Sequence, residues 1–214
     1  MTRFLAFALF SLISTVCWSA KDNAVVCTAP GELEANWAKI RYQTPANQRM
    51  DMYETMLRSL DKAPQQCLAT AEYLIIEAMI RGSMIKLKSS SFSTLKKINK
   101  IQKLLDQAIN KNPAAMDGLG WTLLGLLFDK SPGWPLSIGH DDKAENAYKK
   151  GLEYNPDGID TNYYFGDFLR RKDLPLQAQR YLLIASQAKQ RAGREIAHQG
   201  RLKDVQRVLL KLSQ

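Results

Sequence analysis

A spaced pattern of small and large side chains occurs twice in the second half of this chain of 214 residues. The first copy places Gly125 after a large residue, and Ala144 and Tyr148 follow one helix further on. The second copy repeats this order with Gly166 and Ala178. Small side chains at such positions let two helices approach closely, and large ones fill the space beside them. The pattern therefore predicts helix–turn–helix units that stack on one another.

The rest of the chain also has helical spacing, because apolar residues recur at steps of three and four. No segment alternates with the period of two that a strand would show. Further helices are expected over residues 32–41, 49–61, 70–87, 94–110 and 193–212. We predict an all-α chain of about nine helices, arranged as four pairs plus a C-terminal capping helix. A single domain would span residues 21–214, with the clearest repeats at 116–157 and 159–190.

The order of Trp121, Gly125, Ala144, Tyr148 and Pro156 is that of a tetratricopeptide (TPR) unit, a helical hairpin of about 34 residues. Four segments extend the likeness: residues 131–136, 155–160, 162–167 and 193–196. On these residues the chain resembles a group of small exported TPR proteins of Gram-negative bacteria. More distantly it looks like the T-component of TRAP-type periplasmic transporters. The resemblance implies a TPR-like α–α superhelix whose concave groove binds partner peptides.

In repeats that look like this, the first helix of each pair lines the groove. Carried onto this sequence, the resemblance implies partner contacts at Thr122, Asp129, Lys130, Tyr163, Asp167, Arg170 and Arg171. The two arginines would clamp a carboxylate of an extended polar segment. The other interpretation is that all of these are ordinary solvated helix positions.

The third unit carries a seven-residue insertion relative to the fourth, within residues 130–141. Its prolines and glycines predict a shaped loop, and insertions of this kind often lie on the binding face. Trp134 lies in this loop. The indole could fill a gap in the packing or stand out as an anchor for a partner.

Residues 1–20 have the form of a secretory signal peptide: one early positive charge, an apolar run and small residues for cleavage near Ser19 and Ala20. The apolar run of about 13 residues is shorter than the roughly 20 that a membrane span needs. We therefore expect an exported, periplasmic protein with no transmembrane segment in the mature chain.

Removal of the leader would leave Cys27 and Cys67 as the cysteines of the mature chain. Two cysteines in an oxidising compartment favour one disulfide. Two unpaired thiols are the alternative.

No residue pattern indicates catalysis or a metal site. The histidines, His140 and His198, are far apart in sequence and have no partner at ligand spacing. The motifs of hydrolases, phosphate loops and zinc proteases are absent from the sequence. We therefore expect no enzyme activity, no metal and no cofactor.

The formal net charge is +9, and basic residues dominate residues 81–103. Several of these fall opposite the apolar stripe of their helix, which is typical of a solvated face. Nucleic acid is therefore not an expected partner.

Two functions remain. The favoured one is a non-catalytic periplasmic scaffold that binds a protein or peptide partner. The alternative is an accessory ligand-binding or carrier factor that works with a transporter or an envelope-assembly system. The first requires an open groove, and the second requires an enclosed pocket with convergent polar groups.

Overall fold

The computed structural model describes residues 26–87, 92–133 and 136–212. Apart from one isolated β-bridge, between Gly133 and Gly139, the regular structure of these residues is helical. The all-α prediction is confirmed. The helices are α1 (Pro30–Tyr42), α2 (Arg49–Leu60), α3 (Gln65–Leu68), α4 (Ala71–Leu87), α5 (Phe92–Lys111), α6 (Ala115–Lys130), α7 (Asp141–Tyr154), α8 (Ile159–Arg171), α9 (Pro175–Gln187) and α10 (Glu195–Leu212).

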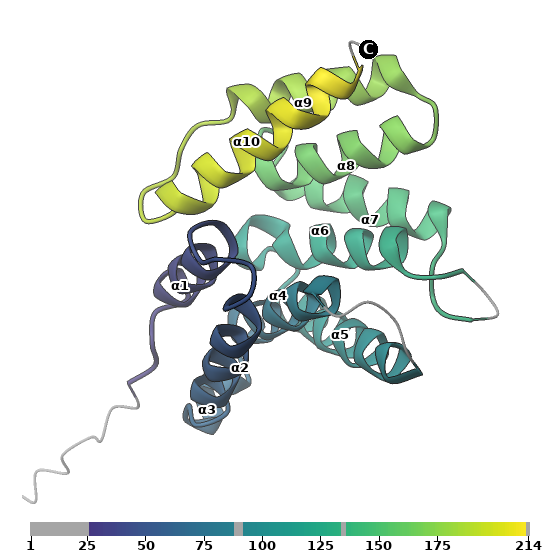
Figure 1. Cartoon of the computed structure of the whole chain (residues 1–214). Helices are drawn as coiled ribbons and strands as arrows, with labels where there is room; N and C mark the ends of the chain where they lie inside the picture. The colour runs from purple at the N-terminus through teal and green to yellow at the C-terminus, as the bar shows by residue number, and fades with distance from the viewer. Residues whose placement is uncertain (1–25, 88–91, 134–135, 213–214) are drawn as a thin grey trace, which may run out of the picture.

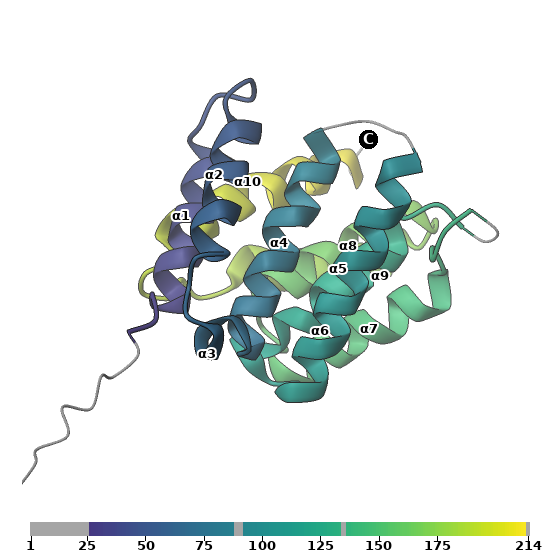
Figure 2. The same cartoon turned by 90° about the horizontal axis from the view of Figure 1, so that it is seen from below.

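Neighbouring helices pack as hairpins. α4 packs on α5, α6 on α7 and α8 on α9, and Figure 1 shows α6 to α9 layered one on the next. Seen from below, α4 and α5 run side by side (Figure 2). Gly125 shows why the small residues are needed, because a Cβ added there would lie 2.8 Å from a ring carbon of Tyr148.

The N-terminal helices are arranged less regularly. Both α1 and α2 pack on α4, and the short α3 lies between α2 and α4 in sequence. α3 was not expected, because a helix of four residues is too short to show an amphipathic period.

The last helix does more than cap the array. α10 packs on α9, as expected, but it also contacts α8 and α1, so the two ends of the described chain meet. Gly200 makes this possible, because an added Cβ there would clash with the ring of Tyr42 on α1. The buried face of α10 is also more polar than expected, since it includes His198, Arg201 and Asp204.

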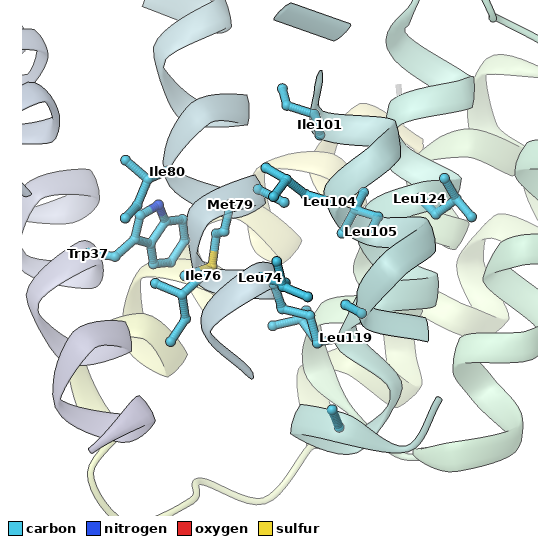
Figure 3. Packing of buried hydrophobic residues seen from close by; sticks show 14 of the residues in the cluster. Trp37, Leu74, Ile76, Met79, Ile80, Ile101, Leu104, Leu105, Leu119 and Leu124 are labelled. Atoms are coloured by element: carbon cyan, nitrogen blue, oxygen red, sulfur yellow. The ribbon is translucent and has the colours of Figure 1, made fainter. Parts of the chain in front are cut away.

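One large apolar cluster runs through the fold from α1 to α10. In Figure 3, Trp37 of α1 lies beside Ile76 and Ile80 of α4, and side chains of α5 and α6 continue the cluster. Full burial of one large apolar side chain of this cluster stabilises the fold by roughly 1.5–3 kcal/mol. A smaller cluster joins α8, α9 and α10 around Leu182 and Val205.

Cys27 and Cys67 form a disulfide, with their Cα atoms 5.7 Å apart. This confirms the expected pairing and excludes the two free thiols. The bridge links the segment that precedes α1 to the short helix α3. Beside it, the Tyr73 hydroxyl donates a hydrogen bond of 2.9 Å to the carbonyl of Thr28.

The predicted register of the fourth unit can be tested at Gly166. Its expected neighbours are present: an added Cβ would lie 2.8 Å from Leu182 Cγ and 3.2 Å from the carbonyl oxygen of Ala178. We expect Gly166→Leu to lower the free energy of unfolding by roughly 1–3 kcal/mol or more, because the extra atoms overpack the α8–α9 interface.

The same contacts revise the expectation for Gly166→Ala. From the sequence this change is nearly neutral, because the gain in helix propensity offsets mild crowding. In the structure the added methyl meets the branch point of a fully buried leucine, so we expect a measurable loss. Urea denaturation of both variants checks this, and a parental midpoint for Gly166→Leu would contradict the packing.

Two further sequence expectations, the shaped insertion and the signal peptide, concern segments that the structure describes in part or not at all. The insertion is shaped as expected in its described part: the Gly139 and His140 amides donate to the carbonyls of Pro132 and Phe128. Trp134 and the signal peptide lie outside the described residues. Among the described helices, none has the length and apolar character needed to cross a membrane.

Candidate functional site

Six helices converge on a hollow of about 150 Å³, here called the groove pocket. The walls come from α1, α2, α4, α5, α6 and α8. The wall is mostly apolar and includes Trp37, Met79, Ile85, Ile101, Leu123 and Leu127. A space of this size and character fits one large apolar side chain.

Three cations surround the groove pocket. Arg41 lies in the last turn of α1, Arg49 begins α2, and Lys130 ends α6. None of the described residues that line the groove pocket is Asp or Glu. The field at this opening therefore favours a ligand with negative charge next to its apolar part.

The polar groups behind the pocket wall are enclosed by the fold. Trp37 Nε1 donates to Ser83 Oγ at 2.9 Å, and Ser83 donates in turn to the Met79 carbonyl at 2.9 Å. The Tyr53 hydroxyl is buried and has no hydrogen-bond partner among the described residues. Burial raises the pKa of Tyr53, although Ser83 and the nearby arginines act in the opposite direction. Tyr53 thus stays neutral, and its hydroxyl is enclosed by the fold rather than open to a ligand.

A second hollow of about 350 Å³, the basic basin, adjoins the groove pocket and shares Arg41 and Arg49 with it. Lys203 and Arg207 of α10 line its other side. Its carboxylate, Asp204, already pairs with Arg201 and Arg207. The basin extends the positive surface from the N-terminal helices to α10.

Five of the residues predicted to bind a partner come together beside the groove pocket. Asp129 and Lys130 end α6, and Asp167, Arg170 and Arg171 end α8. Arg171 binds the Asp129 carboxylate with both terminal nitrogens, at 2.7 and 2.6 Å. Arg170 binds Asp167 at 2.9 Å, and Lys130 lies 3.4 Å from Asp129 and 3.5 Å from Asp167.

These ion pairs change what the arginines can do. The Asp129 side chain is only 2% exposed and also accepts a hydrogen bond of 3.3 Å from Tyr148. Burial opposes the ionisation of Asp167, but Arg170, Lys130 and Arg171 outweigh it and lower its pKa. A partner carboxylate would therefore compete with internal carboxylates for Arg170 and Arg171, and also for Lys130. Of the five, Lys130 is the one that lines the groove pocket.

The other predicted contacts are placed differently. Thr122 is fully buried, and its hydroxyl lies 2.6 Å from that of Thr161 on α8. It therefore holds two helices together, and the expectation that it faces the groove is corrected. Tyr163 is partly covered by the Arg201 guanidinium of α10, 4.7 Å from its ring centre. Trp134 lies outside the described residues.

A buried charge network, not expected from the sequence, joins α1, α8 and α10. Arg201 is 3% exposed and binds Asp160 at 2.9 Å, Asp204 at 3.2 Å and the Tyr164 hydroxyl at 2.7 Å. Arg194 pairs with Asp160 and with Glu34 of α1. Its members are more than 30 residues apart in places, and no motif spacing connects them.

The charges in this network are mutually dependent. Burial opposes the ionisation of Asp160, but Arg201 and Arg194 outweigh it and lower the pKa of this carboxyl. For Glu34, burial exceeds the attraction of Arg194 and raises the pKa. The network therefore needs Arg201 to keep Asp160 charged inside the fold.

The groove pocket was also missed from the sequence, since most of its wall comes from the first, degenerate helical pairs. One available signal was the position of Arg41 and Arg49 on the two sides of the same turn. Among the described residues, no group of three or more His, Cys, Asp or Glu could hold a metal ion. No protein-family model matches the chain, and no curated protein matches its sequence.

Proposed function

We propose that this chain is a non-catalytic helical-repeat scaffold of the TPR type that binds a protein or peptide partner in its groove. The groove pocket carries this proposal, because it combines an apolar wall with a rim of Arg41, Arg49 and Lys130. An apolar side chain of the partner enters the pocket, and a neighbouring acidic group meets the cations of the rim.

The size of the groove pocket favours a peptide over a small molecule. Sites for small molecules usually measure roughly 300–1,000 Å³, and this pocket measures about 150 Å³. The alternative function, an accessory ligand-binding or carrier factor that works with a transporter or an envelope-assembly system, would require a larger enclosed space than the groove pocket.

The compartment forms part of the proposal. The Cys27–Cys67 disulfide is compatible with an oxidising environment. Together with the leader expected at residues 1–20, it supports export to the periplasm. The partner would then be a periplasmic protein or the exposed segment of an envelope complex.

Gly82 offers a sharp test, since it lines the groove pocket and an added Cβ there would meet no atom within 4 Å. The Cβ of Gly82→Leu has free space and its remaining atoms extend into the pocket region, and the change also removes a helix-destabilising glycine. Gly31→Leu is the matched control, because Gly31 is exposed on α1 and also has free space.

The measurement is affinity purification from the periplasm with the wild-type chain and both variants. We expect the same co-purifying protein with wild type and Gly31→Leu, and at least a tenfold loss with Gly82→Leu, as for removal of a central anchor contact. Equal recovery with Gly82→Leu would contradict binding through the groove pocket.

A further inference from the structure

A hollow larger than the groove pocket lies away from it and shares no lining residue with it. This cavity, here called the α8-end cavity, measures about 450 Å³, which is within the usual range for small-molecule sites. It lies between the start of α6, the first turn of α8, the α9–α10 connection and the start of α10. The α9–α10 connection runs down the left side of Figure 1 toward α1.

Two conspicuous sequence segments, residues 155–160 and 193–196, contribute to this cavity and have no role in the groove. The backbone at its edge is strained, because Met116 and Asp117 both have left-handed conformations with φ of 51° and 58°. Strain of this kind costs about 1–3 kcal/mol per residue and is frequent at ligand sites.

One end of the cavity provides donors for an anion. The first intrahelical bond of α8 runs from the Asn162 amide to the Gly158 carbonyl, so the amides of residues 159–161 have no partner within the helix. The N-cap residue, Gly158, has no side chain to bind them. A helix N-terminus with free amides attracts negative groups.

A buried side chain adds an independent donor. His198 is 8% exposed and lines the cavity, and no described residue forms a hydrogen bond with its ring. Arg194 also lines the cavity, but its terminal nitrogen already pairs with Asp160 and Glu34.

The cavity also leaves one charge of each sign unpaired. Asp117 pairs with Arg191, and Asp160 pairs with Arg194. Asp157 and Lys189 line the same cavity, and neither forms an ion pair within the described residues. The cavity thus offers a free carboxylate for a ligand ammonium, in addition to the donors for a ligand carboxylate.

We propose that the α8-end cavity binds a small zwitterionic amino-carboxylate. The ligand carboxylate accepts hydrogen bonds from the first-turn amides of α8 and from His198. The ligand ammonium pairs with Asp157. This site is separate from the groove pocket, and the proposal does not depend on the proposed function.

The test uses the twenty standard L-amino acids at millimolar concentration in a thermal-shift screen of the purified chain, followed by calorimetric titration of any that raise Tm. For each amino acid that binds, two analogues are titrated: one without the amine and one without the carboxylate. We expect at least one amino acid to bind, and both analogues to bind at least tenfold more weakly, since each loses charge-assisted hydrogen bonds. A screen with no shift, or an analogue that binds as tightly as its parent, overturns the proposal.

Variants locate the site. Asp157→Asn and His198→Leu should each weaken binding about tenfold. Asp157 is exposed, so this variant does not disturb the core even if His198→Leu fails to fold. Asp142→Asn, at an exposed position outside the cavity, is the matched control. Gly82→Leu should also bind with unchanged affinity. An unchanged Asp157→Asn, or a loss with Gly82→Leu, places the amino acid elsewhere and contradicts the proposal.

Discussion

Arg201→Ala is expected to lower the free energy of unfolding by about 3–5 kcal/mol, because it removes the central cation of a buried network. Arg201 connects Asp160 and Asp204, and its guanidinium stacks on two rings, 4.4 Å from the ring centre of Tyr164 and 4.7 Å from that of Tyr163. Without it, two largely buried carboxylates lose a partner and the α8–α10 interface loses packing. Urea denaturation with both midpoint and slope determined is the appropriate measurement.

Arg207→Ala is the matched control. Arg207 binds the same Asp204 at 2.9 Å, but its side chain is 65% exposed. Exposed ion pairs contribute about 0–1 kcal/mol, so this variant should remain within that range of the wild type. If both arginine variants lose the same small amount, α10 is not held by the buried network.

Cys67→Ala should lower the free energy of unfolding by about 2–4 kcal/mol under oxidising conditions. The bridge spans a sequence separation of 40 residues, for which the chain-entropy relation gives about 4 kcal/mol as an upper expectation. Part of the loss comes from packing, since Cys67 is fully buried and belongs to a small cluster with Leu60 and Tyr73.

Cys27→Ala separates the contribution of the bridge from that of packing. Cys27 is exposed, so this variant removes the bridge and no buried contact. Most of the decrease in the free energy of unfolding should therefore be the same in both single variants. Under reducing conditions the wild type should approach Cys27→Ala in stability. Wild-type stability for Cys27→Ala under oxidising conditions would contradict a structural role for the bridge.

The helical hairpins could be predicted because their determinants are local. Gly125 and Gly166 mark close approaches between helices adjacent in sequence, so spacing alone indicates the packing. The cluster beside the groove pocket was predictable for a related reason: Asp129 and Arg171 both lie at the ends of first helices in successive units, and such ends stack.

Contacts between distant segments could not be predicted in this way. The position of α10 against α1 depends on how much the whole stack curves. No sequence motif indicates that Gly200 packs directly against the ring of Tyr42. The buried pair of Asp160 and Arg201 depends on the same closure. His198 looked like an isolated residue in the sequence, because its neighbours in the cavity come from three other segments.

The most direct test of the central claim is site-specific photo-crosslinking in the periplasm. A photoreactive phenylalanine analogue replaces Leu126, which lines the groove pocket, or Leu176, which is 82% exposed on α9 away from it. Groove binding predicts one discrete adduct from position 126, absent from position 176 and abolished when Gly82→Leu is added. An adduct from position 176 with none from position 126 would contradict a partner bound in the groove.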